Sequence, residues 1–212
     1  MSVTTKKFPL THTELIELAG NQLIRFPATF EEYWELVRAA EFRADFYQNE
    51  IITMSYENEV HADIVTEILG ILKLIFPRKD KTHTVYNPNR PVYVADCKGH
   101  VTFNPDGSVV PRPPVLYEHS KGMNASVNPI LVFEVLSPST RAYDFGTKLP
   151  CYKQIESLQT IVYLETFEPK VIVMERLSPN QWKETTYTKA TDVFTINQQA
   201  ISLQEIYLGI HF

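Results

Sequence analysis

The sequence lacks features that define several whole classes of protein. Its 212 residues contain no run of about 18 apolar residues, which a membrane-spanning helix requires. The N-terminal segment MSVTTKKFPLTHTEL has no apolar stretch after its lysines, as a secretory signal would have. Cys97 and Cys151 are the only cysteines, too few for a disulfide framework and without the spacing of a metal site. We therefore expect a cytoplasmic protein that does not contact a membrane.

Glycine and positive charge are also scarce. Seven glycines and no glycine-rich phosphate loop argue against a nucleotide-binding fold. The 20 basic and 25 acidic residues give a net charge of −5, the wrong sign for broad attraction to nucleic acid. A basic surface would have to be local, and two places supply one: PRKDK (77–81) with Lys73, and Arg141 with Lys148 and Lys153. Solvated charge at a loop or helix end is the alternative interpretation of both.

What is present is the composition of an ordinary globular protein. A hydrophobic share of 44% is enough for a core, and no low-complexity tract or repeat suggests disorder or a solenoid. One domain is the usual outcome at this length. We expect residues 1–25 to form an N-terminal extension and residues 26–212 to form a single domain.

Helical and strand periodicities alternate along the chain. The expected helices cover residues 26–42, 57–76, the second half of 140–158, and 201–209. The expected strands cover a hairpin in 42–55, an edge or irregular segment in 84–94, the short runs on either side of Pro105-Asp106-Gly107, and 130–136, 160–166, 170–176 and 181–189. Residues 111–129 are rich in Pro and polar residues and read as a loop. The pattern predicts an α/β or α+β fold with a mixed central sheet flanked by helices.

Local signals sharpen some of these boundaries. Thr29 is expected to cap the first helix, and Pro77 to end the second. Gln48 and Asn49 mark the turn of the hairpin. Pro150 is tolerated only in the first turn of a helix, so Thr147 is the expected cap there.

Glu134 lies in the apolar run ILVFEVL (130–136), which is typical of a strand covered on both faces. The two-residue period of a strand places Glu134 on one face with Val132 and Leu136. A buried carboxylate costs several kcal/mol unless it meets a cation or hydrogen-bond donors. Glu134 therefore needs a partner, and Arg141 is one structural possibility.

Asp106 lies in NPDGSVV (104–110), where Asn-Pro-Asp-Gly is by itself good turn chemistry. The functional interpretation depends on the pair of acids, because Glu134 follows 28 residues later in a buried strand. One or two carboxylates, with water and substrate phosphate, are enough to hold Mg²⁺.

Pro-Asp followed by Glu-x-x in a buried strand is similar to the PD-(D/E)xK superfamily of metal-dependent nucleases. More closely, residues 104–110 and the segment ILVFEVLSPSTRAYDFGTKLPCYK (130–153) resemble the Uma-type family of restriction endonuclease-like proteins. The likeness covers roughly residues 26–176. It implies a restriction-endonuclease-like core in which Asp106 and Glu134 are catalytic and hold Mg²⁺, with Mn²⁺ as a possible substitute.

The resemblance has one gap. The superfamily often has a lysine two residues after the acid, and here that position is Leu136. The resemblance implies that Lys148, in the next helix, takes this catalytic role and orients water or offsets charge on the phosphate. A solvated lysine near a helix start is the alternative, because the helix dipole disfavours a cation there.

Two further residues are accessory candidates by the same resemblance. His61 lies on the polar side of the helix 57–76, where a structural histidine bonded to a neighbouring turn is the alternative. Asp45 precedes the predicted hairpin turn and could support the site or be an ordinary strand-edge charge.

These observations predict a metal-dependent endonuclease that hydrolyses phosphodiester bonds of DNA and acts as a homodimer on duplex substrate. The alternative is a catalytically silent module of nuclease fold that binds nucleic acid or a protein partner. The lysine missing at Leu136 and the acidic net charge favour the silent module. The joint presence of Asp106, Glu134 and Lys148 favours the enzyme.

Overall fold

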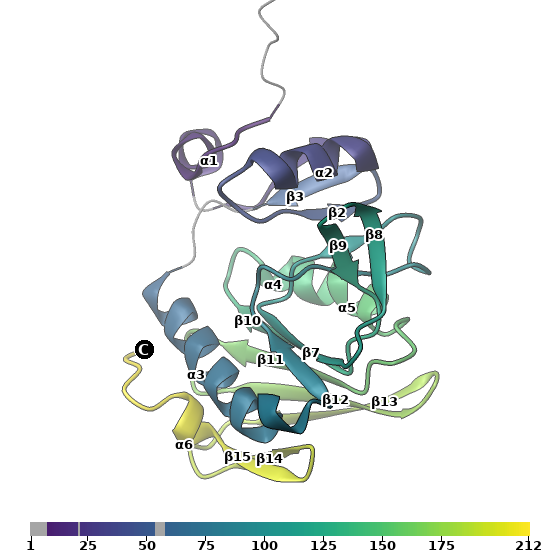
Figure 1. Ribbon diagram of the computed structural model, residues 1–212. Coiled ribbons are helices and arrows are strands. Elements are labelled where there is room, and N and C mark those ends of the chain that lie inside the picture. The colour runs from purple at the N-terminus through teal and green to yellow at the C-terminus, as the bar shows by residue number, and fades with distance from the viewer. Residues whose placement is uncertain (1–7, 21, 54–57) are drawn as a thin grey trace, which may run out of the picture.

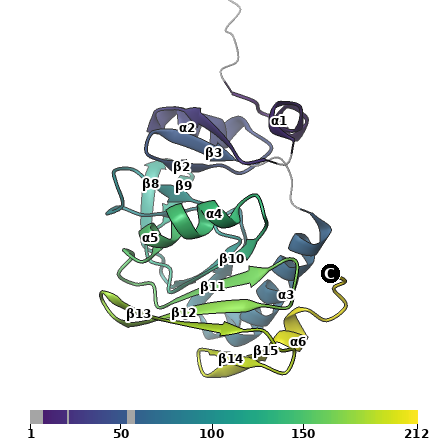
Figure 2. The same cartoon turned by 180° about the vertical axis from the view of Figure 1, so that it is seen from behind.

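In a computed structural model of the chain, helices pack against two mixed sheets (Figure 1). The structure describes residues 8–20, 22–53 and 58–212. In this part of the chain α4 and α5 lie between the N-terminal layer and strands β10 to β13, as the view from behind also shows (Figure 2). The predicted class, a mixed sheet flanked by helices, is confirmed.

The second sheet carries the central strand that the sequence predicts. In the described residues its order is β13-β12-β11-β10-β7-β4. Its strands are β4 (His83–Tyr86), β7 (Gly107–Pro111), β10 (Leu131–Leu136), β11 (Thr160–Glu165), β12 (Val171–Ser178) and β13 (Gln181–Tyr187). Strand β10 pairs in parallel with β11 and antiparallel with β7, and all its residues are buried. An apolar run covered on both faces thus forms the middle of the sheet, and β4 forms its edge.

Helix α3 (Glu59–Ile75) covers one face of this sheet. The Asn58 side chain caps it by accepting from the His61 backbone N–H, and Pro77 follows its end, as predicted. Its apolar stripe packs against Leu131, Phe133 and Val135 of β10, together with α6 (Leu203–Ile206). The alternate residues of β10 face the opposite core, which contains Tyr152 and other residues of α5. Since the two cores sit on opposite sides of β10, Glu134 lies on the α5 side.

The first sheet contains the N-terminal elements. Its order is β1-β3-β2-β6-β5-β9-β8 within the described residues. Its strands are β1 (Ile24–Pro27), β2 (Asp45–Tyr47), β3 (Glu50–Thr53), β5 (Val92–Tyr93), β6 (Thr102–Phe103), β8 (Leu116–Ser120) and β9 (Met123–Ser126). Helices α1 (His12–Ala19) and α2 (Phe30–Ala39) pack against it. Thr29 caps α2, and Gln48 and Asn49 turn the β2–β3 hairpin at φ of 51° and 61°, as predicted. The predicted boundary after residue 25 falls inside β1.

The segment 140–158 is already helical from Arg141, which corrects the prediction of a cap at Thr147. Helix α4 (Arg141–Tyr143), a π-helical turn η2 (Asp144–Lys148) and α5 (Leu149–Tyr152) follow one another without a break. Thr147 therefore lies inside η2. The wide π turn brings the Asp144 and Lys148 side chains together, with Oδ1 and Nζ 3.1 Å apart.

Two other predictions are wrong. Residues 111–129 are not a loop throughout, because β8 and β9 form an antiparallel hairpin there. The predicted helix 201–209 begins as the end of β15 (Gln199–Ser202), which pairs with β14 (Val193–Ile196), and only Leu203–Ile206 is helical. Cys97 and Cys151, too few for a disulfide framework, form a single disulfide across 54 residues of sequence. A short 3₁₀ turn, η1 (Arg78–Asp80), follows α3.

No helix in the part of the chain that the structure describes is long and apolar enough to cross a membrane. The longest, α3, has 17 residues and is amphipathic.

Candidate active site

Asp106 lies where the chain passes from β6 in the first sheet to β7 in the second. Its Oδ2 accepts from the Val135 backbone N–H at 2.7 Å and lies 3.2 Å from His61 Nε2. Its Oδ1 is 4.0 Å from the Arg43 guanidinium. Gly107 is required by packing, because a Cβ there would lie 2.2 Å from the Phe133 ring. The Pro-Asp-Gly segment is therefore a crossing point between the sheets that holds a buried acid.

Glu134 projects from the middle of the second sheet toward Asp106. Its Oε2 accepts from the Asp106 backbone N–H at 3.3 Å. Its Oε1 accepts from Lys148 Nζ at 3.0 Å and from the Tyr152 hydroxyl at 2.7 Å. Arg141 is not its partner, since that guanidinium pairs with Glu165. The predicted need for a partner is met by Lys148 and Tyr152.

Lys148 is buried, with 7% of its surface exposed, and is not a solvated lysine. Besides Glu134, its Nζ lies 3.1 Å from Asp144 Oδ1 and 3.6 Å from Asp45 Oδ2. Leu136 is fully buried in the core on the α5 side. The ammonium that pairs with Glu134 thus comes from Lys148 in η2, whereas in the ExK pattern the lysine lies on the strand itself, at the position of Leu136.

Asp45 joins the N-terminal sheet to this cluster. Its Oδ1 accepts from the Asn104 backbone and side-chain amides at 2.6 and 3.2 Å, and its Oδ2 accepts from the Tyr143 hydroxyl at 3.0 Å. His61 is likewise buried and beside Asp106, on the first turn of α3. Both accessory candidates lie in the cluster with Asp106, Glu134 and Lys148.

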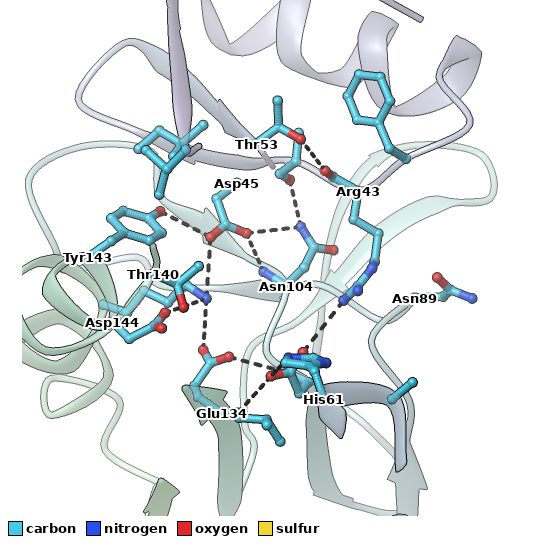
Figure 3. Close-up of a pocket in the computed structure, with 18 of the residues that line it drawn as sticks. Arg43, Asp45, Thr53, His61, Asn89, Asn104, Glu134, Thr140, Tyr143 and Asp144 are labelled. Carbon is cyan, nitrogen blue, oxygen red and sulfur yellow. Dashed lines mark hydrogen bonds and ion pairs between the residues drawn. The ribbon is translucent and has the colours of Figure 1, made fainter. Parts of the chain in front are cut away.

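The cluster lines a pocket of about 430 Å³ between the two sheets. Figure 3 shows Asp45, Glu134 and Asp144 pointing toward a common centre from β2, β10 and η2. Sequence reasoning did not single out Asp144, Tyr143, Tyr152, Arg43 or Asn104 as site residues. Only Asp144 left a usable signal, since it precedes Lys148 by four residues, the spacing of helix neighbours.

The electrostatics show that negative charge exceeds positive charge in the pocket. Burial, with Asp144 and Asp106 nearby, raises the pKa of Glu134 to about 8, although Lys148 and Tyr152 act in the opposite direction. Burial also raises the pKa of Asp144 against the pull of Lys148. Burial would lower the pKa of Lys148, but its carboxylate neighbours raise it well above the ordinary value.

The pKa shifts of Lys148 and Glu134 are not those of a simple ion pair, in which both groups would be held in their charged forms. The raised pKa of Lys148 favours its charged form, but the raised pKa of Glu134 favours its neutral form. The number of groups explains this: one buried ammonium is shared by several buried carboxylates, so some acid is left without full compensation. Asp106 is the exception among the acids. Burial works against its ionisation, yet His61 and Arg43 hold its pKa below the ordinary value.

The residues present fit a divalent cation. Asp45, Glu134 and Asp144 are buried beside Lys148, and the buried Asp106 adjoins Glu134, so a further positive charge would relieve their repulsion. Among the described residues, no group of three or more His, Cys, Asp or Glu is arranged so that it could hold a metal ion. A site made by Asp106 and Glu134, completed by water and phosphate, is the open kind that suits Mg²⁺.

The comparisons with known proteins agree with this geometry. The family model of Uma2, described as "Putative restriction endonuclease", matches residues 30–204. The chain belongs to the Uma2 family. A relative from Synechocystis sp. (strain ATCC 27184 / PCC 6803 / Kazusa), the uncharacterized protein sll1609, is 25% identical over 154 residues, which are 73% of this chain and 84% of that protein. The predicted family is thus confirmed.

A solved structure has the same fold. It is described as "a putative nuclease belonging to DUF820 from Anabaena variabilis ATCC 29413" and superposes with a TM-score of 0.62 at 16% identity. The match covers 94% of this chain and 98% of the other. At this identity the likeness establishes the fold, and the site must be argued from its own residues.

Proposed function

We propose that this protein is a metal-dependent endonuclease that hydrolyses phosphodiester bonds of DNA. One observation carries the proposal: Asp106, Glu134 and Lys148, from three different elements, meet in one pocket. The family is described as a restriction endonuclease family and the structural neighbour as a nuclease, and both descriptions support the same reaction class.

Asp106 and Glu134 would hold Mg²⁺, with Mn²⁺ as a substitute. When bound, such an ion polarises a phosphoryl oxygen and lowers the pKa of a water molecule. The chain's own residues do the rest. Lys148 places an ammonium beside Glu134, where it offsets charge that develops on the phosphate as water attacks in line and the leaving oxygen departs. His61, beside Asp106, keeps that carboxylate ionised and oriented.

The silent module remains the second candidate because of one specific feature. Lys148 lies within 3.0 to 3.6 Å of three carboxylates, so the cluster already contains an internal cation. A protein that relies on this cation alone would bind a partner without cleaving it. The homodimer is likewise a proposal, which follows from the need to cut both strands of a duplex.

Cleavage of supercoiled plasmid with Mg²⁺ or Mn²⁺ tests the function. We expect nicked and linear products from the unmodified protein, none after metal chelation, and a loss of about 100-fold or more for Asp106→Asn. Glu165→Gln is the matched control, since Glu165 is as buried as Asp106 but pairs with Arg141 outside the acid cluster.

Calorimetry with Mg²⁺ separates the two candidates. Metal binding that disappears in Asp106→Asn, together with cleavage, supports the enzyme. Metal binding without cleavage of DNA or RNA favours the silent module. Equal cleavage by Asp106→Asn and Glu165→Gln would remove the basis for the catalytic assignment.

A further inference from the structure

A second groove, of about 1040 Å³, lies at the C-terminal end of α3, whereas the acidic pocket lies at the N-terminal end of the same helix. It is formed by the end of α3, the turn η1, the edge strand β4 and the residues after β7. The basic side chains that line it are Lys73, Arg78, Lys81, His83 and Arg112, and among the described lining residues none is Asp or Glu. In a chain of net charge −5 this is a local concentration of positive charge.

The cations of the groove are not used for folding in the way that Lys148 is. Lys73, Arg78, Lys81 and Arg112 form no ion pair with any described residue. Lys73 lies in the last turn of α3, where the helix dipole alone favours a cation. That account does not extend to Arg78 and Lys81, which lie on and just after η1. Arg112, beyond β7, donates a hydrogen bond from its Nε to Thr84 Oγ1 and is held in place at the groove by it. The convergence of these cations on one groove without an acidic partner among the described residues suits an anionic ligand.

The distance between the groove and the pocket can be estimated from two elements that run from one to the other. Strand β7 begins after Asp106 in the pocket and ends before Arg112 in the groove, a span of about 20 Å at about 3.3 Å per residue. Helix α3 carries His61 at the pocket and Lys73 at the groove, about 18 Å apart at about 1.5 Å per residue. The two estimates correspond to about five to six base pairs of a duplex that rises about 3.4 Å per pair.

The edge of the sheet connects the two sites. Tyr86, at the end of β4, lines the groove, and Asn89, three residues later, lines the pocket. The guanidinium of Arg90, the residue after Asn89, lies 5.4 Å from the centre of the Tyr86 ring. No strand covers the outer edge of β4 in the described residues. Helix α3 and the segment that follows β4 therefore each lead from residues that line the groove to residues that line the pocket.

We propose that the groove binds the phosphate backbone of duplex DNA about five to six base pairs from the bond that lies in the acidic pocket. The inference rests on the proposed function, because it assigns the groove to the substrate of that pocket. A duplex is stiff over this length. Contacts at two points therefore fix its direction across the pocket, which a single contact cannot do.

The test compares two triple variants that remove the same charge. The groove variant is Lys73→Gln, Arg78→Gln and Lys81→Gln. The control is Lys121→Gln, Lys183→Gln and Lys189→Gln, three exposed lysines on or beside β8, β9 and β13. Fluorescence anisotropy without divalent metal measures binding of a labelled duplex of about 16 base pairs, at salt concentrations between about 50 and 200 mM.

We expect the groove variant to bind about tenfold more weakly and its log–log salt slope to fall by up to about 3, since each lost phosphate contact removes about one unit. The control should change binding less than about twofold. Equal losses in the two variants overturn the proposal. So does a loss that appears only with single-stranded DNA of the same length.

A small substrate separates this proposal from the proposed function. Bis(4-nitrophenyl) phosphate is too short to reach the groove, so its cleavage with Mn²⁺ should be the same in the groove variant as in the unmodified protein. If the unmodified protein cleaves nothing but the binding difference holds, the groove assignment stands and the endonuclease fails. If it cleaves plasmid and the groove variant binds and cleaves like the control, the endonuclease stands and the groove assignment fails.

Discussion

The acidic pocket and the basic groove handle charge in opposite ways. In the pocket the acids Asp45, Asp106, Glu134 and Asp144 and the ammonium of Lys148 are buried and contact one another or neighbouring donors, as Glu134 contacts Lys148 and Tyr152. In the groove most of the charges are exposed, and Lys73, Arg78 and Lys81 have no acidic partner among the described residues. Removal of the partner of a buried charge strongly destabilises the fold, whereas an exposed charge contributes little to stability and is screened by salt. This contrast supports the two proposals, a catalytic site in the pocket and an anion-binding surface in the groove.

The largest effect on stability is expected for Lys148→Met. This change leaves three buried carboxylates without their ammonium, so the free energy of unfolding at pH 8 should fall by about 3–5 kcal/mol. The loss should be smaller at pH 5, where the acids can protonate. Urea unfolding measures both values. Lys183→Met, which removes an exposed lysine beside Glu175, is the control and should stay within about 0.5 kcal/mol; equal effects would contradict the comparison.

The next effect is the pH dependence that Glu134 imposes. The pKa of Glu134 is about 8 in the folded protein against an ordinary 4.5, so above pH 4.5 the unfolded chain loses a proton that the folded chain keeps. The free energy of unfolding should therefore fall as pH rises from about 4.5 to about 8, by an amount on the order of a few kcal/mol.

Glu134→Gln should remove most of that fall, because an amide does not ionise. The measurement is a series of urea unfolding curves across this pH range. Glu165→Gln serves as the control and should keep the slope of the unmodified protein. A Glu134→Gln protein with an unchanged slope would show that other groups cause the pH dependence.

A smaller effect is expected for Tyr152→Phe. The Tyr152 hydroxyl donates to Glu134 Oε1 at 2.7 Å, and its loss removes one hydrogen bond to a buried carboxyl group, worth about 1.5–3 kcal/mol if that group is charged and about 1 if it is neutral. Tyr163→Phe is the matched control, since the Tyr163 hydroxyl reaches the Asp144 carbonyl only at 3.5 Å. Thermal unfolding should separate the two variants, and a larger shift for Tyr163→Phe would argue against a special role of Tyr152.

The smallest effect belongs to the groove. The cations of the groove repel one another and stabilise no buried acid. The free energy of unfolding of the triple variant at Lys73, Arg78 and Lys81 should therefore lie within about 0.5 kcal/mol of the value for the unmodified protein, or slightly above it. The same urea curves measure it. A large destabilisation would mean that these side chains serve the fold, and the contrast with the pocket would disappear.

The sequence predicted well where one periodicity governs a whole element. The apolar residues of α3 recur with the 3.6-residue period of a helix, and β10 is a continuous apolar run. Both elements are present where the sequence predicts them. The hairpin of β8 and β9 was missed because its residues are partly exposed and follow a Pro-rich stretch, so neither alternation nor an apolar run marks it. The π turn at Asp144 has no sequence signal of its own, and this made Thr147 look like a helix start.

The candidate site was predictable only in part for a related reason. Asp106, Glu134 and Lys148 could be named from local context and family resemblance. The partners that complete the cluster are distant in sequence, as Tyr143 and Asp45 are at 98 residues apart. Such contacts arise from the way the two sheets meet, which spacing along the chain does not encode. The disulfide between Cys97 and Cys151 is another case of the same kind.

The two acids at the centre of the pocket are tied to each other through the main chain. Asp106 accepts from the backbone beside Glu134, and Glu134 accepts from the backbone of Asp106. Their separation is therefore a property of the sheet, and neither side chain can turn away without breaking a bond at the β7–β10 junction. Local opening of that junction would separate the two acids in a single step, so amide exchange at Asp106 and Val135 reports directly on the fraction of molecules in which the pair is intact.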